Sequence, residues 1–375
     1  RYNDTEQHLM SDCANLVDKT FSEKSAGGLL SMVIDFADAF DAKTEYFYFR
    51  NVALKITPES IVPVSYDHIN FFIPALARKP YDFTMRVFKA PFEITESQEY
   101  IMRKEAIEKK DAMRNEDGSP VFSIIEIGQM RAELTEWAQT YRWNVDWKGK
   151  REQDLWPSLR VIRGCANTLW EQEQDAIRNK QKMSSDDMAI INSHFVNLIS
   201  GIGRVCFRTW DKMENVCPYL LEDSIPDEKQ ATGGSGKSWV INTFVGSAVN
   251  VFKVDMRHFR DTGDARFSLT DVIKYPGKFR VVHWEDKPKS FPLDYFYVQI
   301  TGGTSAERKH GDVVSFKMKD SPLHVITSNY PLSDDASSTI GRFPLVSFSN
   351  RFARENPQKR QPARMMSDIM KGFSK

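Results

Sequence analysis

The segment ATGGSGKSWV, residues 231–240, restricts the possible folds more than any other stretch, because it resembles a phosphate-binding loop. In the pattern G-x-x-x-x-G-K-[ST], glycines let backbone N–H groups face a phosphate, and the helix that follows adds a partial positive end. Ala231 replaces the first glycine, and the polar residues PDEKQ stand where a buried strand usually precedes the loop. The alternative is an ordinary glycine-rich turn before a helix.

The loop predicts a nucleotide site with a distinct role for each residue type. A lysine at this position reaches the outer phosphates, and the hydroxyl of the next residue is a magnesium ligand. We therefore expect ATP and Mg²⁺ as cofactors, with Ser238 as a metal ligand. The residues expected to bind the nucleotide are Gly233, Gly234, Ser235, Gly236, Lys237 and Ser238.

A second motif, FRVVHWED at residues 279–286, is an apolar strand that ends in two carboxylates. A magnesium–ATP site needs one carboxylate to hold the metal and another to polarise the attacking water. We expect Glu285 to activate water, and both Glu285 and Asp286 to contribute to the metal site. The alternative is a strand that ends in a charged turn, and the position about fifty residues after the loop favours the functional interpretation.

Two further polar positions follow the acidic pair. LHVITSN, residues 323–329, is another apolar strand, and Asn329 at its end is a candidate to orient the attacking water. Asn also favours turns, so a plain strand–turn boundary is the alternative. Arg342 is a candidate to stabilise transition-state charge at a neighbouring subunit's site. Taken alone, a surface arginine before a strand explains Arg342 equally well.

A polar segment between the acids and Asn329, TGGTSAERKHGDVVSFKMKD at residues 301–320, predicts a protruding hairpin. Lys309 and His310 stand at its expected tip, beside Gly311. An exposed Lys-His pair suits contact with a phosphate backbone. A solvated hairpin without a ligand is the alternative.

The chain divides by pattern into several regions. Strands alternate with helices over residues 226–350, which predicts an α/β motor with ligands at the strand ends. Residues 121–225 have mostly helical spacing and are expected to form a collar or oligomerisation region. Residues 1–120 read as an N-terminal α+β region without an assigned role, and residues 351–375 as a basic tail.

Composition excludes some classes of protein. The formal net charge is zero, so overall charge does not indicate a nucleic-acid partner. From Arg342 onward, however, eight Lys and Arg face two acids, which leaves a net charge of +6. The four cysteines form no C-x-x-C pair and none pairs with a histidine at zinc spacing, which argues against a Cys/His metal site.

The motifs occur in one order within residues 231–342: phosphate loop, acidic strand end, Lys-His hairpin, Asn-ended strand and arginine. This order resembles superfamily 3 helicases, the hexameric AAA+ motors of small DNA viruses, phages and plasmids. SAERKHGDVVSFKMKDSPLHVITSN is similar to papillomavirus replicative helicases. VVHWEDKPKSFPLDYFYVQITGGTSAERK and SNYPLSDDASSTIGRF are more similar to poxvirus-type and phage or plasmid primase–helicases. The resemblance covers roughly residues 229–352.

The resemblance implies a P-loop NTPase motor of the AAA+ class that forms a homo-oligomeric ring of six subunits. It implies that Lys309 and His310 grip single-stranded or forked DNA, that Asn329 is the sensor, and that Arg342 is the arginine finger. A primase module or another replication partner is expected. With no signal-peptide pattern and no apolar run of about 18 residues, we expect a location in the host cytoplasm or nucleus, without secretion or membrane contact.

Two other classes of function remain open at this point. One is a DNA-binding remodelling or packaging ATPase that hydrolyses ATP without separating strands. The other is a non-catalytic replication initiator subunit whose nucleotide site has decayed. Strand displacement separates the helicase from the remodeller, and ATP turnover separates both from the initiator.

Overall fold

The computed structural model describes residues 44–68, 77–84, 91–148, 157–207, 216–222, 234–265, 267–275, 277–307, 313–316, 321–332 and 337–352. Its strands are β1 (Glu45–Tyr48), β2 (Ala53–Ile56), β3 (Ile61–Val64), β4 (Phe92–Glu96), β5 (Trp143–Trp147), β6 (Tyr219–Glu222), β7 (Val251–Asp255), β8 (Val281–Lys287), β9 (Ser305–Glu307), β10 (Val313–Ser315), β11 (Leu323–Ser328) and β12 (Leu345–Phe348). Its α-helices are α3 (Gln98–Ala112), α4 (Ile124–Tyr141), α5 (Pro157–Ala166), α6 (Trp170–Arg178), α7 (Ser185–Cys206), α8 (Lys237–Trp239), α9 (Gly246–Ala248), α10 (Thr262–Ala265), α11 (Thr270–Lys274), α12 (Asp294–Thr301) and α13 (Ser337–Arg342). Three short non-α elements are η2 (Tyr66–His68), the π-helix η5 (Val240–Val245) and η7 (Asn350–Phe352).

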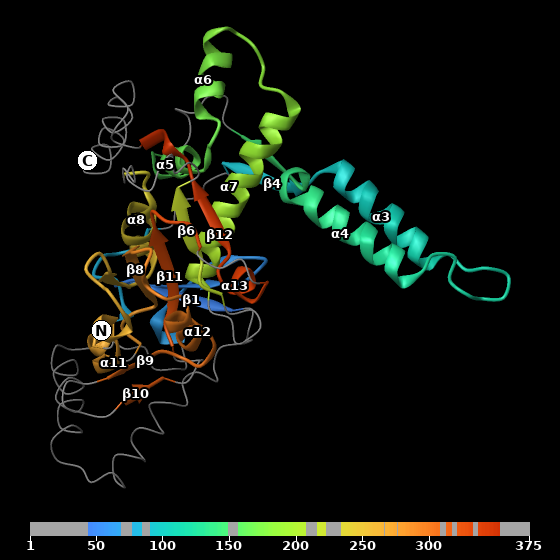
Figure 1. The fold of residues 1–375 in the computed structure, drawn as a ribbon. Coiled ribbons are helices and arrows are strands. Elements are labelled where there is room, and N and C mark those ends of the chain that lie inside the picture. Colours follow the sequence, from blue (N-terminus) through green and yellow to red (C-terminus); the bar gives the residue numbers. More distant parts are fainter. Residues whose placement is uncertain are drawn as a thin grey trace, which may run out of the picture.

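A parallel sheet of five strands, in the order β12-β6-β11-β8-β7, forms the centre of the described structure (Figure 1). Every neighbouring pair in it is parallel. Parallel sheets are covered on both faces, so their strands are nearly continuous apolar runs. All six residues of β11 are buried, as are six of the seven in β8. The α/β class expected from the alternating pattern is therefore confirmed.

Successive residues along a strand point to opposite faces, and the two faces carry separate cores. One core contains Val281 and Val325 and packs against α5, α7 and the helical run from α8 to α9. The other core contains Val282, Trp284 and Ile326 and packs against residues of α11 and α12. The sheet is thus the middle layer of three, and its strand ends are the positions that lie open to a ligand.

The sheet begins earlier in the chain than the sequence pattern indicates. The expected motor starts at residue 226, but β6 ends at Glu222 and lies between β11 and β12. A buried strand does precede the phosphate loop, separated from it by the polar segment. The expected helical region also contains β5, which pairs with β4 in an antiparallel ribbon. That pairing joins segments about fifty residues apart, and a local periodicity does not report such a contact.

The segments YFYFRNVALKI (46–56) and SIVPVSY (60–66) predict short strands, and the antiparallel sheet β1-β2-β3 confirms them. It is attached to the central unit by polar contacts. Glu45 in β1 forms an ion pair with Arg280, immediately before β8. Lys79 donates a hydrogen bond of 2.6 Å from Nζ to the carbonyl oxygen of Gly246 in α9.

Helices α3 and α4 form an antiparallel pair that projects away from the central sheet (Figure 1). Ser97 caps α3, and Ser123 and Glu126 form a capping box at the start of α4. Opposite charges at helical spacing in residues 95–115 predict a solvated helix, and α3, which has no buried residue, confirms it. The turn residues of NEDGSP, 115–120, predict a loop, and this segment joins the two helices.

The apolar spacing of SAGGLLSMVIDFADAF predicts a helix over 25–40, and KQAT (229–232) is a candidate short strand before the phosphate loop. Both segments, and the expected tail beyond Phe352, fall outside the described residues. Within the described ranges, no helix combines the length and the apolar character that crossing a bilayer requires.

Candidate functional site

The topology of the sheet selects one edge as the ligand-binding position. The chain leaves β6 toward β7, the outermost strand on one side of the sheet. It leaves β11 toward β12, the outermost strand on the opposite side. In open α/β sheets, ligands bind at the carboxyl ends of neighbouring strands whose connections diverge in this way. β6 ends at Glu222 and β11 ends at Ser328, so this switch point falls between Glu222 and Asn329.

The described part of the phosphate loop lies at this switch point, because Lys237 directly after it contacts both Glu222 and Asn329. Gly234 and Gly236 have φ angles of 91° and 100°, a left-handed region that glycine adopts without strain. Gly236 is the N-cap of α8, so the helical run begins at Lys237 as the motif predicts. The loop is anchored from behind where Cys165 Sγ approaches the carbonyl oxygen of Ser235 at 3.5 Å. Gly233 and Ala231 lie outside the described residues.

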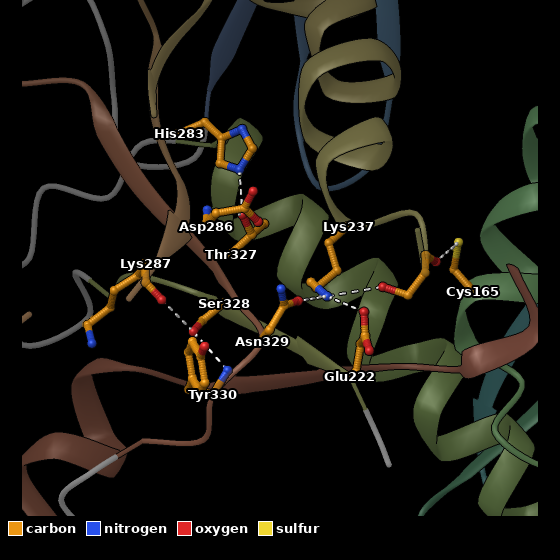
Figure 2. A network of polar contacts seen from close by, with 11 residues as sticks. Cys165, Glu222, Lys237, His283, Asp286, Lys287, Thr327, Ser328, Asn329 and Tyr330 are labelled. Carbon is orange, nitrogen blue, oxygen red and sulfur yellow. Dashed lines mark hydrogen bonds and ion pairs between the residues drawn. The ribbon is translucent and has the colours of Figure 1, made fainter. Parts of the chain in front are cut away.

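Lys237 is the centre of the site, and its side chain is only 6% exposed. Its Nζ donates to Glu222 Oε1 at 2.8 Å, to Asn329 Oδ1 at 3.0 Å and to Ser235 Oγ at 3.1 Å. Figure 2 shows this ammonium between the ends of β6 and β11. Burial lowers the pKa of Lys237, and the Glu222 carboxylate opposes that shift. The structure thus brings together the predicted residues Lys237 and Asn329.

The acidic pair lies near the carboxyl end of β8, the next strand beyond β11, and is followed in the strand by Lys287. Glu285 is 7% exposed, accepts a hydrogen bond from the Ser238 side chain and pairs with Lys253 of β7. Burial acts to raise the pKa of Glu285, but hydrogen bonds from Lys253 and Ser238 lower it overall. A hydroxyl and an ionised carboxylate therefore meet at the start of the helix, and both are oxygen ligands of the kind that Mg²⁺ prefers.

Asp286 differs from its neighbour in backbone and in charge environment. Its φ is 54°, in the left-handed region that few residues other than glycine adopt. Burial, followed by the negative charge of Glu285, raises the pKa of Asp286, while Lys237 and Arg257 act in the opposite direction. Two adjacent carboxylates with pKa values moved in opposite directions are typical of a site where one holds a charge and the other accepts a proton.

A buried histidine, His283, links the end of β11 to the helix after the phosphate loop, and Figure 2 shows its contact with Thr327 beside Asp286. His283 Nδ1 lies 2.8 Å from Asn242 Oδ1, and its Nε2 lies 3.0 Å from Thr327 Oγ1. The Thr327 oxygen also accepts the backbone N–H of Asp286 at 3.3 Å. A carbonyl oxygen only accepts, so Nδ1 of neutral His283 carries the proton and Thr327 donates to Nε2. Asn242 belongs to the π-helix η5, a helical irregularity frequent at functional sites.

Acid should weaken the fold through His283. Burial lowers its pKa from 6.5 to about 4, so the folded protein holds this proton less tightly than the unfolded chain. The resulting stabilisation is complete above pH 6.5 and is lost as the pH falls through about 4. Between pH 7 and pH 4.5, we predict that the free energy of unfolding of the wild type falls by about 2 kcal/mol more than that of His283→Gln. The glutamine retains a donor and an acceptor but does not titrate in this range. Urea titrations at both values measure this, and equal losses would refute it.

The hairpin predicted to hold Lys309 and His310 has its base in the described structure. β9 and β10 form an antiparallel pair, in which Glu307 lies opposite Val313 and Ser305 lies opposite Ser315. Thr304, next to β9, contacts Nε2 of buried His324 at 2.8 Å, and His324 Nδ1 accepts from Trp284 Nε1 at 2.9 Å. The hairpin is thus anchored to β11 and β8. Lys309 and His310 themselves lie outside the described residues.

Arg342 does not join the other predicted residues. It ends α13, and its carbonyl oxygen accepts from the backbone N–H of Cys217 at 2.8 Å. Leu345, the first residue of β12, pairs with the first residue of β6, so Arg342 lies at the amino edge of the sheet. The four residues of β6 separate the two edges by about 13 Å. Its guanidinium lies 5.2 Å from the centre of the Tyr297 ring.

Glu222 is the partner of Lys237 that sequence reasoning did not identify. It is 5% exposed and pairs with Lys237 across fifteen residues of chain. The available signal was an acid that ends the apolar run YLL before the polar segment. Among the described residues, no group of three or more His, Cys, Asp or Glu side chains could hold a metal ion. A divalent cation here would therefore need ligands beyond those residue types, such as the Ser238 hydroxyl and nucleotide phosphates.

Comparisons with known proteins add little to this geometry. No protein-family model matches the chain, and no curated protein matches it. Among solved structures, the chain is similar to one described as the A form apo structure of the NrS-1 C-terminal region. The identity is 9% and the TM-score 0.32, over 90% of this chain and 66% of that chain. The chain thus spans slightly less than two thirds of that structure, and a likeness of this size carries no argument about fold or function.

Proposed function

We propose that the chain is an ATP-driven motor that acts on DNA, a helicase of the superfamily 3, AAA+ type suggested by its motifs. The observation that carries the proposal is the position of Lys237, whose Nζ lies 3.0 Å from Asn329 Oδ1 at the carboxyl edge of the sheet. β11 stands between β6 and β8, so Asn329 comes between the phosphate loop and the acidic pair. One edge therefore gathers the residue types that phosphoryl transfer requires.

The contacts support a division of labour between the two acids. Ser238 and Glu285 would hold Mg²⁺, which neutralises phosphate charge when bound. Asp286, with its raised pKa, accepts the proton of the attacking water. Asn329 orients that water through its amide, and Lys237 binds the outer phosphate oxygens. We therefore propose Asp286 as the residue that activates water, whereas the sequence pattern predicts Glu285 in that role.

Strand displacement on a forked DNA duplex tests the proposed function, with ATP turnover measured in the same samples. Unwinding with turnover supports the helicase. Turnover stimulated by DNA without any unwinding would favour the remodelling or packaging ATPase. Absence of both would favour the non-catalytic initiator subunit.

Arg342 is proposed to act on the site of a neighbouring subunit, because it lies at the edge opposite its own phosphate loop. We predict that Arg342→Ala chains and chains with Lys237→Met plus Glu222→Gln are each inactive alone. Mixed together, they should regain part of the ATP turnover, since some interfaces then combine an intact loop with an intact arginine. Turnover is measured across mixing ratios, with Arg50→Ala, an exposed arginine paired with Asp82, as the matched active control. No recovery at any ratio would refute the shared site.

The hairpin is proposed to grip DNA through Lys309 and His310. We predict that Lys309→Ala keeps most of the basal ATP turnover but loses strand displacement, because a phosphate contact is removed without touching the nucleotide. Lys182→Ala, at an exposed lysine between α6 and α7, is the matched control and should unwind normally. Normal unwinding by the Lys309 variant would remove the hairpin from the mechanism.

A further inference from the structure

The Lys237 ammonium has three N–H donors, and the structure supplies three acceptors for them. They are Glu222 Oε1 at 2.8 Å, Asn329 Oδ1 at 3.0 Å and Ser235 Oγ at 3.1 Å. A phosphate oxygen that binds this lysine must therefore displace at least one of them. Of the three acceptors, Glu222 is the one that carries a negative charge, as a phosphate does.

The ion pair between Glu222 and Lys237 is buried, which strengthens the electrostatic interaction between them. The side chains of Glu222 and Lys237 are each 6% exposed, so water screens their interaction little. A nucleoside polyphosphate that took Lys237 would leave a carboxylate without its cation beside several phosphate charges. Like charges at short range in a partly desolvated site repel strongly. The carboxylate thus opposes the ligand twice, by holding the lysine and by repelling the phosphates.

We propose that Glu222 stands in for a phosphate in the nucleotide-free chain and sets the affinity of this site for nucleoside polyphosphates. The inference rests on the proposed nucleotide site and adds a residue that determines its affinity. Strand β6 holds the backbone of Glu222 in the sheet, since Glu222 pairs with Phe348 of β12. The carboxylate thus starts from a fixed strand end, and Lys237 reaches it from the first residue of α8.

Glu222→Gln tests this proposal, because a glutamine oxygen still accepts from Lys237 while the charge is lost. Titration calorimetry with Mg²⁺–ADP should give at least about tenfold tighter binding to the variant than to the wild type. Without nucleotide, the variant should also melt at a lower temperature than the wild type. Adding nucleotide should raise the melting temperature of the variant by more than that of the wild type. A residue with only a structural role would lower the melting temperature without tightening the binding.

Two further variants complete the test. Glu45→Gln removes a carboxylate from another buried ion pair, at the amino edge of the sheet, and should leave nucleotide affinity unchanged. Glu222→Asp keeps the charge but shortens its reach, and should bind with intermediate affinity. It serves in place of Glu222→Gln if that variant does not fold.

The outcomes separate this inference from the proposed function. If the wild type binds nucleotide and the folded Glu222 variants bind it no more tightly, the role of Glu222 is wrong and the nucleotide site stands. If the wild type and every variant bind no nucleotide, the proposed function falls and this inference falls with it.

Discussion

Replacing Lys237 by Met and Glu222 by Gln in the same chain should abolish ATP turnover while the protein stays folded. In the proposed site, Lys237 is the cation that reaches the outer phosphates from the start of α8. Removing one preorganised donor to transition-state charge typically costs about 100- to 1,000-fold in rate. We therefore expect phosphate release at least about 100-fold below the wild type, at a melting temperature close to that of the wild type.

The second substitution is needed because the lysine is buried against a carboxylate at 2.8 Å. Removing one partner of a buried ion pair leaves an uncompensated charge and costs about 3–5 kcal/mol. Lys237→Ala alone should therefore lose stability as well as activity, and its inactivity would not locate the site. Lys148→Ala, an exposed lysine paired with Glu93 and Asp146, is the control that should keep full turnover. Turnover by the double variant would show that the phosphates bind elsewhere.

Asp286→Asn should reduce ATP turnover by about 100- to 10,000-fold, the usual contribution of a general base. The amide has the same shape as the carboxylate but cannot accept the proton of the attacking water. Asparagine also tolerates the left-handed backbone at φ 54°, so the strand end should keep its geometry. Nucleotide binding should persist, since Asp286 accepts the proton only at the chemical step. Stopped-flow phosphate release measures the rate, and calorimetry measures the binding.

Glu285→Gln is the companion variant that distinguishes the two acids. Glu285 accepts from Ser238, so its loss should weaken the dependence of nucleotide binding on Mg²⁺. If Asp286→Asn keeps near-normal turnover while Glu285→Gln abolishes it without affecting Mg²⁺ dependence, the roles are reversed. Glu285 would then be the base, as the sequence interpretation holds.

The strands and the candidate site were predictable to different extents. β8 and β11 could be recognised from sequence because a strand buried on both faces is a nearly continuous apolar run. The polar residues Asp286, near the end of β8, and Asn329, directly after β11, follow from that pattern. The order of the strands could not be obtained this way, because it depends on contacts between distant segments.

Glu222 shows why one part of the site escaped prediction. The motif sets a lysine directly after its glycines, but the length of chain between β6 and the loop is not fixed by local chemistry. Residues 223–233 separate them here, so the strand did not stand where the pattern places it. The partner of Lys237 thus became visible only when β6 and the loop met in space. The position of Arg342 also could not be predicted. Its distance from the phosphate loop depends on the edge of the sheet at which β12 begins.

The most direct test of the nucleotide site is a calorimetric titration of Mg²⁺–ADP into the wild-type chain and into the Lys237→Met, Glu222→Gln double variant. We expect one nucleotide bound per wild-type chain, and binding at least about tenfold weaker in the double variant. Absence of binding to the wild type, or equal affinity in the two proteins, would contradict it.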